Sequence, residues 1–110
     1  MIRGAVYRID LGKATGRAQA GRRRGIVLSD FPATWSTAII VPTTTQEQRA
    51  IFRPKLEIAG QACFALADQI RTFDVEHIVG EPVDYLAPEM LGEIEYAVAK
   101  VLSLRITPTY

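Results

Sequence analysis

The stretch AGRRRGIVLSD, residues 20–30, places three consecutive arginines between two glycines and directly before an apolar run. The run over residues 25–28 is short, continuous and apolar, as in a strand buried on both faces. Asp30, Phe31 and Pro32 follow it and end the pattern. The sequence therefore predicts a buried β-strand whose entrance carries a dense positive charge.

Similar strand patterns lie on both sides of this stretch. Apolar residues alternate with polar ones or form short β-branched runs, which favours extended structure. Between these segments, residues 12–22 hold no large apolar side chain and residues 44–49 are polar, so we expect a mobile surface loop and a turn there. Pro42 is expected to mark a bulge or an edge strand. The segments predicted to be extended are 5–11, 25–28, 37–41, 52–58, 62–67 and 69–73, and a helical turn is predicted over 75–79.

The last element has a different period. Pro88 suits the first position of a helix, and Glu89 suits the positive end of its dipole. Apolar residues then recur every three or four positions as far as Val101 and Leu102, which predicts an amphipathic helix. Short strands followed by one such helix favour a mainly β fold, a small antiparallel β-barrel or curled sheet with the helix packed against it. We expect residues 1–110 to form a single domain.

The composition limits the classes of protein to which the chain can belong. It has 110 residues, 48% of them hydrophobic and 23% charged, as in ordinary globular proteins. Cys63 is the only cysteine, which excludes an internal disulfide and a cysteine-based zinc site and favours a reducing, cytoplasmic setting. The N-terminus lacks the apolar core of a signal peptide, and no apolar stretch is long enough to span a membrane.

The net charge of +1 conceals an uneven distribution along the chain. Residues 1–55 carry 10 Lys and Arg against 3 Asp and Glu, whereas residues 56–110 carry 3 against 9. The two halves therefore have charges of +7 and −6. This separation predicts two oppositely charged faces, provided that separation in sequence becomes separation in space.

The common catalytic motifs are missing. The sequence has neither a phosphate-binding GxxxxGK[ST] loop nor a paired-histidine metal motif. His77 is the only histidine, and Cys63 lies in an apolar segment where an inert core position is expected. We therefore predict no metal site and no cofactor.

Three polar clusters remain as candidate sites, at residues 19–24, 43–45 and 68–69. Arginine matches the geometry of phosphate and stays charged at any relevant pH, and threonine hydroxyls at a strand end can bind phosphate oxygens. An acid and an amide directly after an apolar strand either cap a turn or face a groove. Together the clusters are compatible with metal-free phosphodiester chemistry, while solvated turns explain each of them separately.

Four motifs follow one another along essentially the whole chain: RGAVYRIDL at 3–11, AQAGRRRGIVLS at 18–29, VPTTTQ at 41–46 and ALADQIRT at 65–72. The expected C-terminal helix follows them and ends in VLSL at 101–104. In these motifs and their order the chain resembles the MazF/Kid (PemK-like) toxins of bacterial type II toxin–antitoxin systems.

This resemblance implies an SH3-like antiparallel β-barrel that forms a homodimer, and a sequence-specific, metal-independent endoribonuclease acting on single-stranded RNA, with mRNA as the expected target. In such an enzyme the ribose 2′-OH attacks the adjacent phosphorus and leaves a 2′,3′-cyclic phosphate and a 5′-OH. An acidic antitoxin would be the partner. Alignment with the motifs implies that Arg23 and Thr44 are catalytic. The substrate-binding residues would be Gln19, Arg22, Arg24, Thr45, Asp68 and Gln69.

The chain also departs from the family pattern. Arg24 stands where a proline usually follows the catalytic arginine, so Arg24 is the alternative candidate for that role. Ala18 and Leu66 replace an acid and an arginine that other members carry. Two other functions remain open at this point: a CcdB-like inhibitor of DNA gyrase on the same fold, and a non-catalytic RNA-binding module.

Overall fold

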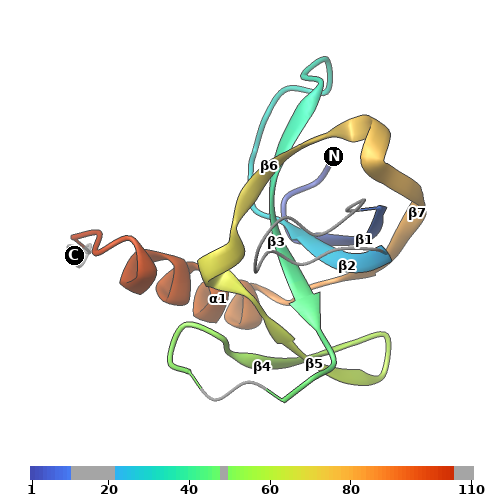
Figure 1. The fold of residues 1–110 in the computed structure, drawn as a ribbon. Coiled ribbons are helices and arrows are strands. Elements are labelled where there is room, and N and C mark those ends of the chain that lie inside the picture. Colours follow the sequence, from blue (N-terminus) through green and yellow to red (C-terminus); the bar gives the residue numbers. More distant parts are fainter. Residues whose placement is uncertain (11–21, 48–49, 106–110) are drawn as a thin grey trace.

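The structure is a computed structural model that describes residues 1–10, 22–47 and 50–105; the side chain of Arg22 is not described. Within these residues it has seven strands, two short 3-10 helices and one α-helix (Figure 1). Most of the loop predicted over residues 12–22, and the end of the turn predicted over 44–49, lie outside the described residues. The strands are β1 (Ala5–Asp10), β2 (Arg22–Val27), β3 (Thr37–Thr44), β4 (Lys55–Ile58), β5 (Gln61–Ala65), β6 (Arg71–Asp74) and β7 (Ile78–Tyr85); the helices are η1 (Ala67–Gln69), η2 (Val75–His77) and α1 (Pro88–Val101).

The strands form one antiparallel sheet in the order β4-β5-β3-β2-β1-β7, with β6 also paired to β3. β3 is the centre of this arrangement, because its first half pairs with β6 and its last two residues pair with β5. A strand that changes partner along its length turns the sheet, and Figure 1 shows β4 and β5 turned away from β1 and β2. The predicted mainly β fold, with a curled antiparallel sheet and a terminal helix, is confirmed.

Pro42 lies inside β3 rather than at an edge or a bulge. It falls between the residues that pair with β6, which end at Ile40, and those that pair with β5, which begin at Thr43. Its carbonyl accepts a hydrogen bond from the Leu66 N–H at 2.8 Å on that side of the strand. A proline is tolerated here because the changeover between two partner strands requires no ladder N–H from it.

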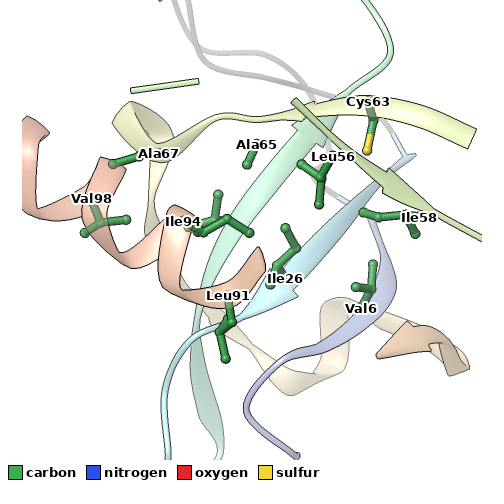
Figure 2. Packing of buried hydrophobic residues seen from close by; sticks show 12 residues of the cluster. Val6, Ile26, Leu56, Ile58, Cys63, Ala65, Ala67, Leu91, Ile94 and Val98 are labelled. Atoms are coloured by element: carbon green, nitrogen blue, oxygen red, sulfur yellow. The ribbon is translucent and has the colours of Figure 1, made fainter. Parts of the chain in front are cut away.

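The larger core lies between α1 and the sheet. The apolar stripe predicted for the helix supplies Leu91, Ile94 and Val98 to this core. Ile94 lies toward Ile26 and Ala65 of the sheet (Figure 2). Ile26 and Ile94 are completely buried. This packing fixes α1 against the strands, as the helical period predicts.

A smaller core lies on the opposite face of β1, β2 and β3. Its buried members include Ile9, Ile40 and Phe73. Gly25 of β2 lies directly between Ile9 and Ile40, and a Cβ atom added to it would overlap with both side chains. A glycine at this position therefore allows β2 to approach the core closely.

The sequence did not predict β7. Gly80, with φ of +73°, and Pro82 interrupt its apolar pattern, and both residues are typical of breaks. β7 pairs only with β1 among the described residues, and their register shifts between Val6 and Arg8. An edge strand tolerates a proline because one of its sides needs no hydrogen-bond donor.

Among the residues that the structure describes, no helix has the length and apolar character required to cross a membrane.

We expect the Gly25→Ala substitution to lower the free energy of unfolding by about 1–3 kcal/mol, because the added methyl group overpacks the smaller core. Gly92→Ala is the matched control. Gly92 lies in α1 with open space around its Cα, so alanine there should raise stability by roughly 0.5–1 kcal/mol through its helix propensity. Urea unfolding followed by circular dichroism measures both changes. If Gly25→Ala were as stable as the wild type, the close packing of Gly25 between Ile9 and Ile40 would be contradicted.

Candidate functional site

A cavity of about 500 Å³ opens where β1, β2, the end of β3 and β5 meet. Its volume suits a group of nucleotide size. Its surface is divided evenly between polar and apolar atoms, and the polar groups are cationic, hydroxyl and amide side chains. The lining residues are Arg8, Arg23, Arg24, Thr43, Thr44, Thr45, Gln46, Gln61 and Cys63.

Arg23 and Thr44 come to this cavity from neighbouring strands. The paired part of β2 and β3 reaches Gly25 and Pro42, and the cavity lies just beyond this pair. Arg23 precedes Gly25 in β2, and Thr44 is the last residue of β3. The two strands thus bring a guanidinium and a hydroxyl to the lining of the same cavity.

Arg24 lies on the other face of β2. Its Nη1 donates a hydrogen bond to the Ile58 carbonyl of β4 at 3.2 Å, and its own carbonyl accepts one from Thr43 Oγ1 at 3.1 Å. These bonds connect β2 to β3 and to the β4–β5 hairpin. Arg24 therefore has a structural contact in addition to its place in the cavity lining.

The Thr44 hydroxyl is held in a defined position. Thr44 is only 8% exposed, and its Oγ1 accepts a hydrogen bond from the Gln46 N–H at 3.2 Å. A hydroxyl has one hydrogen to donate as well as lone pairs to accept. Because Gln46 occupies an acceptor site, the hydroxyl can still donate its hydrogen to a group in the cavity.

The cavity is electrically positive. Arg8, Arg23 and Arg24 line it, and none of the described lining residues carries a carboxylate. Cys63 also borders it, where burial raises the pKa of the thiol and the nearby charge of Arg24 opposes that rise. The thiol is therefore neutral near pH 7, as expected for an inert core cysteine.

The structure places Asp68 and Gln69 in η1, outside the lining of this cavity. The Asp68 carboxylate receives two hydrogen bonds from the Arg53 guanidinium, at 2.9 Å from Nε and 2.6 Å from Nη2. These hydrogen bonds from Arg53 are the main reason why the pKa of Asp68 is lower than its usual value. Asp68 thus joins the segment before β4 to η1, and a part in substrate binding stays a prediction for both residues.

The other predicted residues divide into two groups. Thr45 lines the cavity with Thr44 and Arg23, whereas Gln19 and the side chain of Arg22 lie outside what is described. Sequence reasoning missed Arg8, which is the cross-strand partner of Arg24 in the β1–β2 register. Strand alternation in residues 5–11 was the available signal, but the partner strand and its register were needed to use it. Gln46 and Gln61 were also missed.

No group of three or more metal-ligating side chains occurs among the described residues. The single histidine, His77, lies exposed in η2, away from the residues that line the cavity. The cavity instead offers guanidinium and hydroxyl donors, which suit an anion.

Comparison with known proteins identifies the family that the chain matches. Residues 2–102 match the family model described as PemK-like, MazF-like toxin of type II toxin–antitoxin system. A candidate toxin of Mycobacterium tuberculosis, Rv3098A, is 47% identical over 105 residues, which cover 94% of this chain and 99% of the relative.

Solved structures have the same fold. An endoribonuclease from a mycobacterial species, in complex with its cognate antitoxin, has a TM-score of 0.80 at 22% identity and covers 97% of this chain and 99% of its own. MazF from Deinococcus radiodurans has a TM-score of 0.81 at 22% identity, with coverage of 91% and 94%.

We expect Asp68→Asn to destabilise the protein at pH 7 and to destabilise it less at pH 3. Since the folded-state pKa of Asp68 is lowered, its ion pair with Arg53 stabilises the fold above the unfolded-state pKa of about 4, and this stabilisation disappears as the pH falls through the folded-state value. Urea unfolding at both pH values tests this. Glu57→Gln, on the exposed face of β4, is the control. A stability difference independent of pH would contradict the role of the ion pair.

Proposed function

The chain belongs to the PemK-like, MazF-like toxins of type II toxin–antitoxin systems, and on that premise we propose that it is an endoribonuclease that cleaves single-stranded RNA at specific sequences. The observation that carries the proposal is the positive cavity that Arg23 of β2 and Thr44 of β3 line together. The structural relatives that are described as endoribonucleases support it at the level of the fold.

The reaction is a transfer within the RNA itself. The 2′ oxygen forms a bond to phosphorus while the bond from phosphorus to the 5′ oxygen breaks, which leaves a 2′,3′-cyclic phosphate and a 5′-OH. The 2′-OH loses a proton and the departing 5′ oxygen gains one. Neither step needs a metal ion, provided that the protein stabilises the charge that builds up on the phosphate.

Arg23 and Thr44 are suited to that task. Negative charge grows on the nonbridging phosphate oxygens in the transition state, and donors fixed in advance bind this state more strongly than the ground state. Arg23 supplies a permanent positive charge, and the Thr44 hydroxyl, oriented by the Gln46 N–H, supplies a hydrogen bond. Arg23 does not serve as a base, because guanidinium keeps its proton at all relevant pH values.

The other arginines of the cavity are assigned to the RNA on either side of the cleaved phosphodiester. Arg8 and Arg24 are cross-strand partners on β1 and β2, and both line the cavity. We assign them, with Thr45, to the flanking phosphates, and we assign Gln19 and Arg22 to the same substrate path on the strength of the family motif. Contacts to phosphate give affinity without sequence preference.

The proposed protein partner is an acidic antitoxin segment, and the proposed assembly is a homodimer. A positive cavity attracts carboxylates as well as phosphates, so an acidic chain lying in it would block RNA. The mycobacterial relative that was solved with its cognate antitoxin supports this proposal.

We expect the purified protein to cut a long RNA of mixed sequence at one short recurrent sequence in the presence of EDTA. Removing one donor to a developing oxyanion costs about 10²–10³ in rate, so Arg23→Ala and Thr44→Ala should each abolish most of the activity. Arg71→Ala, on β6 outside the cavity lining, should cleave like the wild type. Sequencing of the 5′ ends maps the cuts, and end-group analysis identifies the cyclic phosphate.

Arg24 provides the sharpest internal comparison in this experiment. Loss of the chemical step in Arg24→Ala with an active Arg23→Ala would show that the catalytic arginine is one residue further along. Intact RNA together with inhibited DNA supercoiling would contradict the proposal in favour of gyrase inhibition. Binding of RNA without cleavage would favour a non-catalytic module.

We also expect Arg8→Ala to weaken RNA binding and to lower its dependence on salt. Each phosphate contact that releases a counterion from a single strand contributes about 0.7 to the slope of log K against log salt concentration. Fluorescence anisotropy with a 2′-O-methyl RNA oligonucleotide, which binds without being cut, measures this slope from 50 to 300 mM KCl. Arg71→Ala again serves as the control. An unchanged slope in Arg8→Ala would exclude a phosphate contact.

A further inference from the structure

The turn between β4 and β5 has a backbone conformation that few residue types adopt without strain. Ile58 pairs with Gln61, so the turn contains only Ala59 and Gly60. Both residues have positive φ, of +49° and +81°. This is the signature of a type I′ turn, in which asparagine, aspartate or glycine is usual at the first position, and an alanine there is strained.

Two hydrogen bonds from other strands hold this turn. Asp84 Oδ2 of β7 accepts from the Ala59 N–H at 2.7 Å, and Arg24 Nη1 of β2 donates to the Ile58 carbonyl at 3.2 Å. The second oxygen of Asp84 accepts from the Tyr85 N–H at 2.8 Å, which fixes the carboxylate in place. The turn is thus attached to the edge of the sheet on one side and to the arginine strand on the other.

Gln61 is the first residue after the turn, and it lines the same cavity as Arg23 and Thr44. It shares its face of β5 with Cys63, two residues further on, which also borders the cavity. The side chain of Gln61 is exposed, unlike the buried thiol of Cys63. Its neutral amide is therefore open to solvent at a cavity whose arginines suit phosphate.

We propose that Gln61 is a specificity-determining residue, whose amide binds the hydrogen-bonding edge of an RNA base next to the phosphate held by Arg23 and Thr44. This proposal rests on the proposed endoribonuclease function. A glutamine amide presents a donor and an acceptor side by side, and unpaired bases in a single strand expose complementary edges. Asp84 is a positioning residue, since it fixes the turn from which Gln61 extends.

The experiment compares the bases flanking the cuts made by the wild type, Gln61→Ala and Gln61→Glu in a long RNA of mixed sequence. Loss of a bidentate base contact is expected to reduce the preference at one position by about tenfold or more, while cleavage continues. Gln61→Glu keeps the acceptors but loses the donor, so its preference at that position should change. Glu57→Ala is the matched control, because Glu57 lies in the same hairpin on the opposite face, across from Ala62.

The positioning role of Asp84 is tested by substituting it in the wild type and in the Gln61→Ala variant. Asp84→Ala should relax the preference at the same base position, and Asp84→Asn, which keeps one acceptor oxygen, should largely restore it. In the Gln61→Ala background, Asp84→Ala should cause no further change at that position. A purely structural role would instead lower the rate at every site equally in both backgrounds and would overturn the positioning assignment.

An unchanged cleavage sequence in Gln61→Ala, at the wild-type rate, would overturn the proposal for Gln61. If the wild type cuts no RNA, the endoribonuclease proposal fails separately. Selection from a random 2′-O-methyl RNA library then decides the question for Gln61 by binding alone. A base preference of the wild type that Gln61→Ala loses supports the proposal, and identical selected sequences contradict it.

Discussion

The antiparallel register between β2 and β3 is the constraint on which the site depends. Pairing of Gly25 with Pro42 sets the alignment, and beyond this pair Arg23 of β2 and Thr44 of β3 both line the cavity. A shift of one residue would turn the side chain of Arg23, the proposed catalytic arginine, to the other face of β2. Gly25 helps to hold this register, because only a residue without a side chain fits between Ile9 and Ile40.

Packing and chemistry are arranged around the same strands. The larger core covers one face of β2 and β3 with α1, while the smaller core covers the other face. Beyond the two cores, polar residues at the start of β2 and at the end of β3 line the cavity. Because packed strands carry them, Arg23 and Thr44 are positioned before RNA binds. Donors that stabilise a transition state need to be fixed in advance in this way.

Much of this could be predicted from the sequence. The apolar run after the arginines, the helix beginning at Pro88 and the role of Cys63 as a buried residue follow from local patterns. β7 could not be predicted, because Gly80 and Pro82 resemble breaks until its place at the edge of the sheet is known. The cavity positions of Arg8 and Gln61 likewise depend on pairings between distant strands. The ion pair of Asp68 with Arg53 joins residues that no local pattern connects.

The proposed catalytic roles require Arg23 and Thr44 to contact the nonbridging oxygens of the cleaved phosphate. Replacing one of these oxygens with sulfur, as separate Rp and Sp diastereomers, in an oligonucleotide that contains the mapped cleavage site tests these contacts. We expect the wild type to cleave one diastereomer much more slowly than the other, and this difference to shrink in Arg23→Ala and in Thr44→Ala. Equal rates for both diastereomers with the wild type, or an undiminished difference in both variants, would contradict the proposed contacts.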